Sequence, residues 1–125
     1  MEEKEMKRFL IAALFFTGLN CAASEFSTEE IVLESVYYAT AIIDYKQTIQ
    51  ISENPDKWME TNPLLDNHPS RGEVNRHFAL TSLLHWGLSE LLSGTDYMRA
   101  YQVSTIGWNL KCINNNIEIG VKISF

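Results

Sequence analysis

Hydrophobic and polar positions follow the period of a helix in the first part of the chain. Apolar residues recur at spacings of three and four from Ile31 to Ile49. Ser27 stands before this segment and Glu30 follows three residues later, which is the pattern of a capping box at a helix N-terminus. The pattern predicts a helix that begins at Ser27, runs to about Ser52 and has much of its circumference apolar.

A long loop and a second helix are predicted next. Residues 53–70 contain all three prolines together with several Asn and Asp residues, and these residue types favour turns over regular structure. Ser70 and Glu73 then repeat the spacing of a capping box before an apolar stripe that reaches Leu92. Gly94 supplies a stop signal, so the second helix is expected to end just before it.

Two structures compete for the last part of the chain. Thr95 or Asp96 can cap a third helix, but from Ile117 to Phe125 apolar and polar residues alternate strictly, which is typical of a strand. A lone strand has nothing to pair with in an otherwise helical chain. We therefore expect the third helix to continue to about Ile119, with an irregular tail behind it. The predicted fold class is all-α, a small bundle of about three helices after an N-terminal signal or anchor helix.

The first 24 residues have the organisation of a secretory signal peptide. Lys4, Lys7 and Arg8 precede an apolar run of eleven residues, 9–19, and small residues follow at positions 22–24. A retained membrane anchor is the alternative, because sixteen uncharged residues separate Arg8 from Glu25. We predict a signal peptide or N-terminal membrane anchor at 1–24 and a single helical domain at 25–125. Both alternatives place an exported chain in the periplasm or at the inner membrane.

Cleavage of such a signal also determines whether the chain can form an internal disulfide. A cut after Ala23 would remove Cys21 and leave Cys112 as the only thiol. Stability would then come from packing and not from a disulfide. Cys21 also suggests a lipid attachment site, but Asn20 precedes it where such a site has a small residue.

Charge and hydropathy narrow the possible partners. The 125 residues include 16 Asp and Glu against 10 Lys and Arg, a formal net charge of -6, and no basic cluster follows the N-terminus. Nucleic acid is therefore excluded as a partner. The longest uncharged run of the later chain, residues 77–89, falls short of the roughly 18 residues of a membrane-spanning helix. The expected partner is a membrane or an envelope protein, and the oligomeric state is left open.

A polar stripe interrupts the first predicted helix. Asp44 lies in an otherwise apolar stretch, and Gln47 and Thr48 share its face. Asp44 is either a buried acid or metal ligand, or a hydrogen-bonded anchor that fixes how the helix meets the loop. We favour the anchor, with loop donors around Asn62 or His68 as its partners.

A metal-dependent hydrolase is the alternative function. It would have to gather Asp44, Glu60, His68 and His85 around a divalent metal, with the loop folded back over the second helix. His77 and His85 lie about 80° apart around a helix, so they do not converge as ligands four residues apart would. The chain contains no HExxH, GxSxG, CxxC, P-loop or dinucleotide-binding motif. We predict no cofactor and no metal, and favour a non-enzymatic protein.

Several motifs give the chain a family resemblance over roughly residues 36–125. The motifs are Asp44-x-x-Gln47-Thr48, Glu60-x-Asn62-Pro63-Leu64-x-x-x-His68-Pro69-Ser70, Val74-Asn75-x-x-Phe78 and the ending Ile119-Gly120-Val121-Lys122-Ile123-Ser124-Phe125. Together they resemble a group of small uncharacterised proteins from bacteriophages, prophages and bacteria, each with a signal-like N-terminus. The chain departs from the group at Tyr45, where a bulkier aromatic such as Trp is usual, and at Asp66, which replaces a Gly.

The resemblance implies a location more than an activity. Similar Asp-to-Gln-Thr and Glu-x-Asn-Pro elements also occur in some small multi-helix membrane proteins, so an exported or membrane-associated helical protein is implied. The group carries no activity that would transfer to this chain. Its polar positions correspond here to Asp44, Gln47, Thr48, Glu60, Asn62, Pro63, His68, Pro69, Asn75 and His85.

Overall fold

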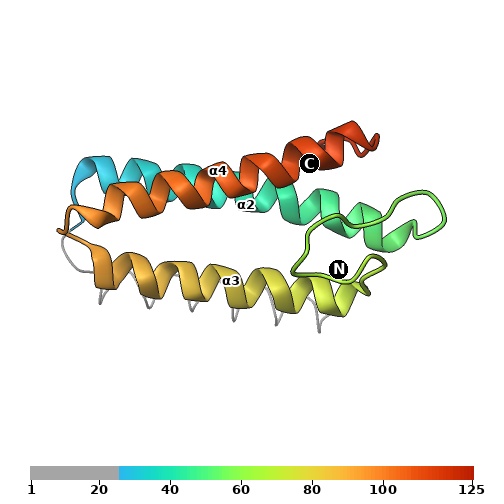
Figure 1. Cartoon of the computed structure of the whole chain (residues 1–125), viewed down its shortest axis with the longest axis horizontal. Coiled ribbons are helices and arrows are strands. Elements are labelled where there is room, and N and C mark those ends of the chain that lie inside the picture. Colours follow the sequence, from blue (N-terminus) through green and yellow to red (C-terminus); the bar gives the residue numbers. More distant parts are fainter. Residues whose placement is uncertain (1–25) are drawn as a thin grey trace.

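The computed structural model describes residues 26–125, and within them the chain forms three helices and no strand. Helix α2 spans Thr28–Glu53, α3 spans Arg71–Leu92 and α4 spans Tyr97–Glu118. Helices α2 and α4 lie side by side and run in the same direction, while α3 runs back along them (Figure 1). The all-α, three-helix prediction is confirmed. The predicted signal or anchor helix lies outside the described residues.

The capping boxes of α2 and α3 form as predicted. The Ser27 hydroxyl accepts the Glu30 amide at 3.2 Å, and the Glu30 carboxylate accepts the Ser27 amide at 2.8 Å. Ser70 and Glu73 make the same reciprocal pair at 3.2 and 2.7 Å. Asp96 occupies the N-cap of α4, but its side chain makes no capping hydrogen bond. The predicted position of the start of α4 is therefore confirmed, but the predicted capping by a side chain of Asp96 is wrong.

Helix α4 ends in a Schellman motif, so residues 117–119 complete the helix and do not begin a strand. Gly120, at a φ of 94°, donates its amide to the Ile117 carbonyl, and Val121 donates its amide to the Asn116 carbonyl, both at 2.9 Å. These two bonds satisfy carbonyls that the end of a helix leaves unpaired. The predicted helix to about Ile119, followed by an irregular tail, is confirmed.

This motif makes a prediction about two glycines. Gly120→Ala is expected to lower the free energy of unfolding by about 1 kcal/mol, because a positive φ is strained for a residue with a Cβ. Gly107→Ala, in the exposed middle of α4, is the control and should raise stability by up to about 1 kcal/mol, since no described atom lies within 4 Å of the new Cβ. Urea denaturation of both variants measures the two effects, and equal shifts of the same sign would contradict the motif.

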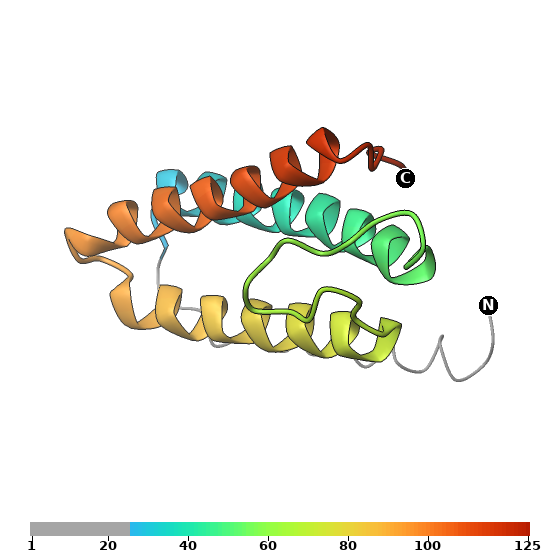
Figure 2. The same cartoon turned by 45° about the vertical axis from the view of Figure 1, so that its right-hand side comes forward.

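The long loop, residues 54–70, is held by its own polar groups. Glu60 Oε1 accepts the amides of Thr61 and Asn62 at 2.9 and 2.7 Å, and Asn62 Oδ1 accepts the amide of Leu64 at 3.0 Å. Glu60 and Asn62 are both buried. The loop turns back along α2 before it reaches α3 (Figure 2).

The interior of the bundle is unusually polar. The buried hydrophobic residues of the described chain are Tyr37, Ala41, Ile51, Val74, Met98, Cys112, Ile113 and Val121. The buried polar residues outnumber them: Glu34, Thr40, Asp44, Gln47, Thr48, Glu60, Asn62, His85, Ser89, Gln102, Asn109 and Asn116. Large apolar side chains lie outside instead, and Ile31 and Ile42 of the predicted apolar stripe are each about half exposed. This part of the apolar stripe therefore lies outside the core, because the polar stripe of α2 faces α4 and has hydrogen-bond partners there.

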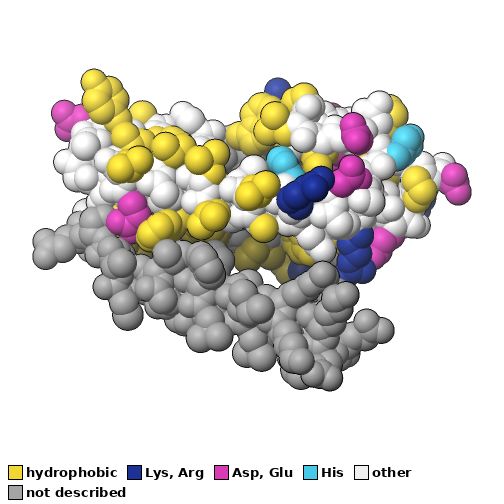
Figure 3. Space-filling model, turned by 90° about the horizontal axis from the view of Figure 1, so that it is seen from below, with side chains coloured by type: hydrophobic (Ala, Val, Ile, Leu, Met, Phe, Trp, Pro, Cys, Tyr) yellow, Lys and Arg dark blue, Asp and Glu magenta, His cyan; other side chains and the backbone are white. Residues whose placement is uncertain are grey.

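Helix α3 also has large apolar side chains on its outer face and polar ones inside. Leu80, Leu83, Leu84 and Leu91 are exposed, Leu91 by 78%. We call these four leucines the apolar stripe of α3. At about 100° per residue they lie on one side of the helix, and the buried Ser89 lies on the opposite side. Figure 3 views the molecule from the α3 side and shows hydrophobic side chains spread over the visible surface. None of the three helices is both long and apolar enough to cross a membrane.

Candidate functional site

Three amide side chains on α4 face α2 at intervals of seven residues: Gln102, Asn109 and Asn116. A seven-residue interval returns a side chain to nearly the same face of a helix, so parallel neighbours such as α2 and α4 can meet once in every two turns. All three amides are buried, and each donates to α2. We call this set the amide ladder.

The second and third positions of the ladder meet the middle and the end of α2. Asn109 donates to the Tyr37 carbonyl at 3.3 Å and to Thr40 Oγ1 at 3.1 Å. Asn116 donates to Asp44 Oδ1 at 3.0 Å and to Gln47 Oε1 at 3.3 Å. The ladder therefore uses the polar stripe of α2 as its acceptors.

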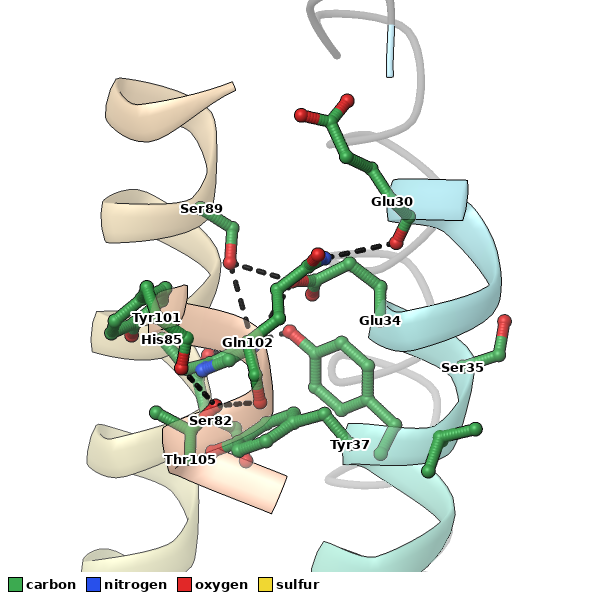
Figure 4. A network of polar contacts seen from close by, with 12 residues as sticks. Glu30, Glu34, Ser35, Tyr37, Ser82, His85, Ser89, Tyr101, Gln102 and Thr105 are labelled. Carbon is green, nitrogen blue, oxygen red and sulfur yellow. Dashed lines mark hydrogen bonds and ion pairs between the residues drawn. The ribbon is translucent and has the colours of Figure 1, made fainter. Parts of the chain in front are cut away.

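The first position of the ladder belongs to a cluster centred on Glu34 (Figure 4). Glu34 Oε1 accepts from Gln102 Nε2 at 3.0 Å and from Ser89 Oγ at 2.7 Å, and His85 Nε2 lies 3.1 Å from the same oxygen. Burial opposes ionisation of Glu34, but the hydrogen bonds from His85, Ser89 and Gln102 outweigh burial and hold the pKa of Glu34 below its usual value. An ionised carboxylate thus joins all three helices.

The cluster contains a Ser, a His and a Glu, but not in the geometry of a catalytic triad. Ser89 and Glu34 both lie near Nε2 of His85, at 3.4 and 3.1 Å, whereas a triad uses the two ring nitrogens for different partners. Because an ionised carboxylate can only accept, Nε2 is the donor to Glu34, and Nδ1 has no hydrogen-bond partner among the described residues. Tyr37 stacks on the imidazole at 3.3 Å between centroids, and Ser89 is fully buried. The arrangement therefore stabilises the fold and does not present a nucleophile.

Asp44 is an anchor of a different kind from the one expected. Its partner is Asn116 on α4, and the loop amides that the sequence assigned to it are accepted by Glu60. Burial, together with the negative charge of Glu60, raises the pKa of Asp44 to about 7, although the hydrogen bond from Asn116 acts in the opposite direction. The expected contact of Asp44 with loop donors is wrong, because the buried face of α2 meets α4 and not the loop backbone.

The other predicted site residues have separate surroundings. Asn75, half-buried, accepts a hydrogen bond from the Tyr45 hydroxyl at 2.8 Å. His68 is exposed, whereas Thr48 and Gln47 are buried. The described residues include no group of three or more His, Cys, Asp or Glu that could hold a metal ion. The proposed ligands Asp44, Glu60, His68 and His85 therefore do not form a metal site in this fold.

A central cavity of about 180 Å³ lies between the helices and the loop. Helix α2 contributes Asp44 and Tyr37 to its wall. The rings of Phe78, Tyr101 and Trp108 and the imidazoles of His77 and His85 also line it. The exposed side chains of Leu64 and Leu84 also line it, so the cavity is open to the outside. An acid beside aromatic rings is a combination that can hold an organic ligand.

The sequence alone did not single out Glu34, Ser89, Gln102, Asn109 or Asn116, although each is central to this interior. The amide ladder did leave a signal, because an amide every seven residues in a predicted helix marks one polar face. Comparison of the chain with protein-family models, with curated proteins and with solved structures finds no match. The resemblance to small phage and bacterial proteins stays a prediction.

Proposed function

We propose that this chain is a small non-enzymatic helical protein of the cell envelope, which associates with a lipid membrane through the outward apolar faces of its helices. One observation carries the proposal: the buried residues of the bundle are mostly polar, whereas large apolar side chains lie on its surface. A protein that remains surrounded by water normally has the opposite distribution.

The apolar stripe of α3 supports this proposal most directly. Its four leucines lie on one face and are each about half exposed or more. Transfer of a leucine side chain out of water is worth about 1.5–3 kcal/mol, so partial burial of four such side chains would contribute roughly 3–6 kcal/mol to membrane association. Helices with an apolar outer face and a polar opposite face are typical of proteins that lie in the membrane interface.

The N-terminal sequence supports the same location. Basic residues followed by an apolar run are typical of chains that are targeted to or across a membrane. In addition, the buried amides of α4 bond to polar groups of α2, and such contacts between helices are expected where water does not compete for hydrogen bonds. The proposed role is therefore contact with the envelope, with the polar cluster and the amide ladder fixing the bundle.

Vesicle flotation tests the proposal. The full chain is expected to float with protein-free lipid vesicles, and the double variant Leu80→Gln and Leu91→Gln should partition at least about tenfold more weakly, because two apolar contacts are lost. The matched control carries Met59→Gln and Ile123→Gln, two exposed apolar residues that lie outside the helices and outside the cavity lining. The control should float like the parent.

Three outcomes would overturn the proposal. The first is equal flotation of the double variant and the parent, which would separate membrane binding from the helix faces. The second is binding to native envelopes but not to protein-free vesicles, which would indicate an envelope protein as the partner. The third is a purely cytoplasmic pool of tagged chain in cells, with its N-terminus intact.

A further inference from the structure

The central cavity has a chemistry that selects one class of ligand. We propose that it binds a small organic ammonium group, with the carboxylate of Asp44 as its counter-ion and the aromatic rings of Tyr37, Phe78, Tyr101 and Trp108 as its wall. This inference goes beyond membrane association, because an ammonium group can come from a free amine or from the headgroup of a zwitterionic lipid.

The aromatic wall provides the first part of the recognition. The face of an aromatic ring carries negative charge density and attracts a cation within about 6 Å, most strongly for Trp. Rings from all three helices line the cavity, Tyr37 from α2, Phe78 from α3 and Trp108 from α4. Lys111 Nζ already lies 5.5 Å from the centre of the Trp108 ring, which is the same kind of contact on this side chain.

The charges around the cavity provide the second part. Asp44 lines it, and the carboxylates of Glu34 and Glu60 lie close enough to influence lining residues: Glu34 acts on Tyr37, and Glu60 on Asp44. None of the described lining residues is Lys or Arg. The imidazoles of His77 and His85 also line it, and burial lowers the pKa of His77, which favours its neutral form. The carboxylates of Asp44, Glu34 and Glu60 outnumber the Lys111 ammonium beside Trp108, so a cation is attracted more strongly than an anion.

The volume of the cavity and the residues that line it favour an organic cation over a bare metal ion. The volume of about 180 Å³ is far above the roughly 10–15 Å³ that one enclosed water needs. Apolar residues such as Leu84 and Leu88 share the wall with the aromatic rings, and a metal ion would leave them without a partner. A substituted ammonium group offers positive charge and apolar surface together.

The first experiment compares choline with its neutral isostere, in which carbon replaces the nitrogen. Calorimetric titration of the full chain at constant ionic strength should give saturable binding of choline, and the isostere should bind about tenfold more weakly or worse. Asp44→Asn and Trp108→Leu should each weaken choline binding about tenfold. Asp56→Asn removes the same charge from the exposed loop and Tyr97→Leu removes an exposed ring of α4, so both controls should bind like the parent.

Three results of this titration would overturn the inference. One is equal affinity for choline and its isostere, which would indicate apolar binding only. Another is undiminished binding by Asp44→Asn or Trp108→Leu, each folded as judged by circular dichroism. The third is the absence of saturation up to about 100 mM choline, since a cation held by a counter-ion and rings is expected to bind more tightly than that.

A second experiment distinguishes the two sources of the ammonium group. Phosphatidylcholine vesicles carry it as a headgroup, and in that case free choline, compared with the same concentration of sodium chloride, should reduce flotation of the parent but not of Asp44→Asn. This arm rests on the proposed membrane association. Choline binding without any flotation would favour a free amine and overturn the membrane proposal alone. Flotation that free choline does not reduce, together with no choline binding in solution, would overturn the ammonium site alone.

Discussion

Asp44→Asn is expected to stabilise the folded chain at pH 8 by about 2–4 kcal/mol. In the parent at this pH, the folded state must hold an ionised carboxylate in a buried position near the charge of Glu60. The amide has nearly the same shape and can still accept the hydrogen bond from Asn116. Because burial and the nearby charge of Glu60 raise the pKa of Asp44 from 3.8 to about 7, ionisation costs stability that the neutral amide does not lose.

The pH dependence gives this prediction its sign. Between about pH 4 and pH 7 the folded state holds a proton on Asp44 that the unfolded chain has released, so the contribution of Asp44 to stability falls as pH rises through this range. At about pH 4, close to the unfolded-state value of 3.8, the parent and Asp44→Asn should therefore differ little in stability, and at pH 8 the variant should be more stable. Urea denaturation at the two pH values measures the difference, in which the effects of other titrating groups cancel.

Asp56→Asn is the control for this experiment, because it removes one acid from an exposed loop position and should change stability by less than about 0.5 kcal/mol at both pH values. A pH dependence that is identical in the parent and in Asp44→Asn would contradict the buried position of Asp44. Asp44→Ala should recover less stability than Asp44→Asn at pH 8, because it strands the Asn116 amide.

The second large effect is expected for Glu34→Ala, which should lower the free energy of unfolding by about 3–5 kcal/mol. Removal of the carboxylate leaves His85, Ser89 and Gln102 without their shared acceptor in a buried site. Glu29→Ala, five residues earlier on α2, is the matched control. Its ion pair with Arg99 at 3.1 Å is largely exposed, so its loss should cost less than about 1 kcal/mol.

Thermal melts of Glu34→Gln and of the parent then show how much stability comes from the charge of Glu34 and how much from the shape of its side chain. The amide keeps one acceptor and should recover part of the lost stability. Because the hydrogen bonds hold the pKa of Glu34 below its ordinary value of 4.5, its contribution to stability is complete above that pH and is lost as pH falls through the lowered pKa. Acidification should therefore destabilise the parent more than Glu34→Gln. A variant as acid-sensitive as the parent would show that the cluster is not held by an ionised acid.

Local signals in the sequence were sufficient to predict the helices. The capping boxes at Ser27 and Ser70 involve residues three positions apart, so they can be identified before any tertiary contact is known. The end of α4 was predicted for a similar reason, since a strand needs a distant partner and a helix does not. The failure of Asp96 to cap α4 with its side chain depends on details of backbone geometry that residue type does not determine.

The interior could not be predicted in the same way, because it depends on which faces of the helices meet. The apolar stripe of α2 appeared to be its buried face, yet Ile31 and Ile42 are exposed and Thr40 is buried. Hydrophobic periodicity locates a face but does not say whether that face meets a helix or the outside. Glu34 and Asp44 became buried because α4 supplies Gln102 and Asn116 opposite them, and that pairing spans about seventy residues of sequence.

The regular spacing of the amide ladder determines which alignments of α4 along α2 are allowed. A slide of α4 by one turn would carry every amide away from its acceptor, whereas a slide by two turns would bring Asn109 to the acceptors of a neighbouring position. The slide by two turns would thus keep some amides opposite polar groups. It would break a contact at the end of α4, where the Ile119 carbonyl accepts a hydrogen bond from Trp58 Nε1 at 3.1 Å. Gln50 of α2 adds a second fixed contact, because its Nε2 donates to the Lys122 carbonyl at 2.9 Å. A chain with both Trp58→Phe and Gln50→Leu should therefore populate a slipped alignment that paramagnetic distance measurements between α2 and α4 would detect.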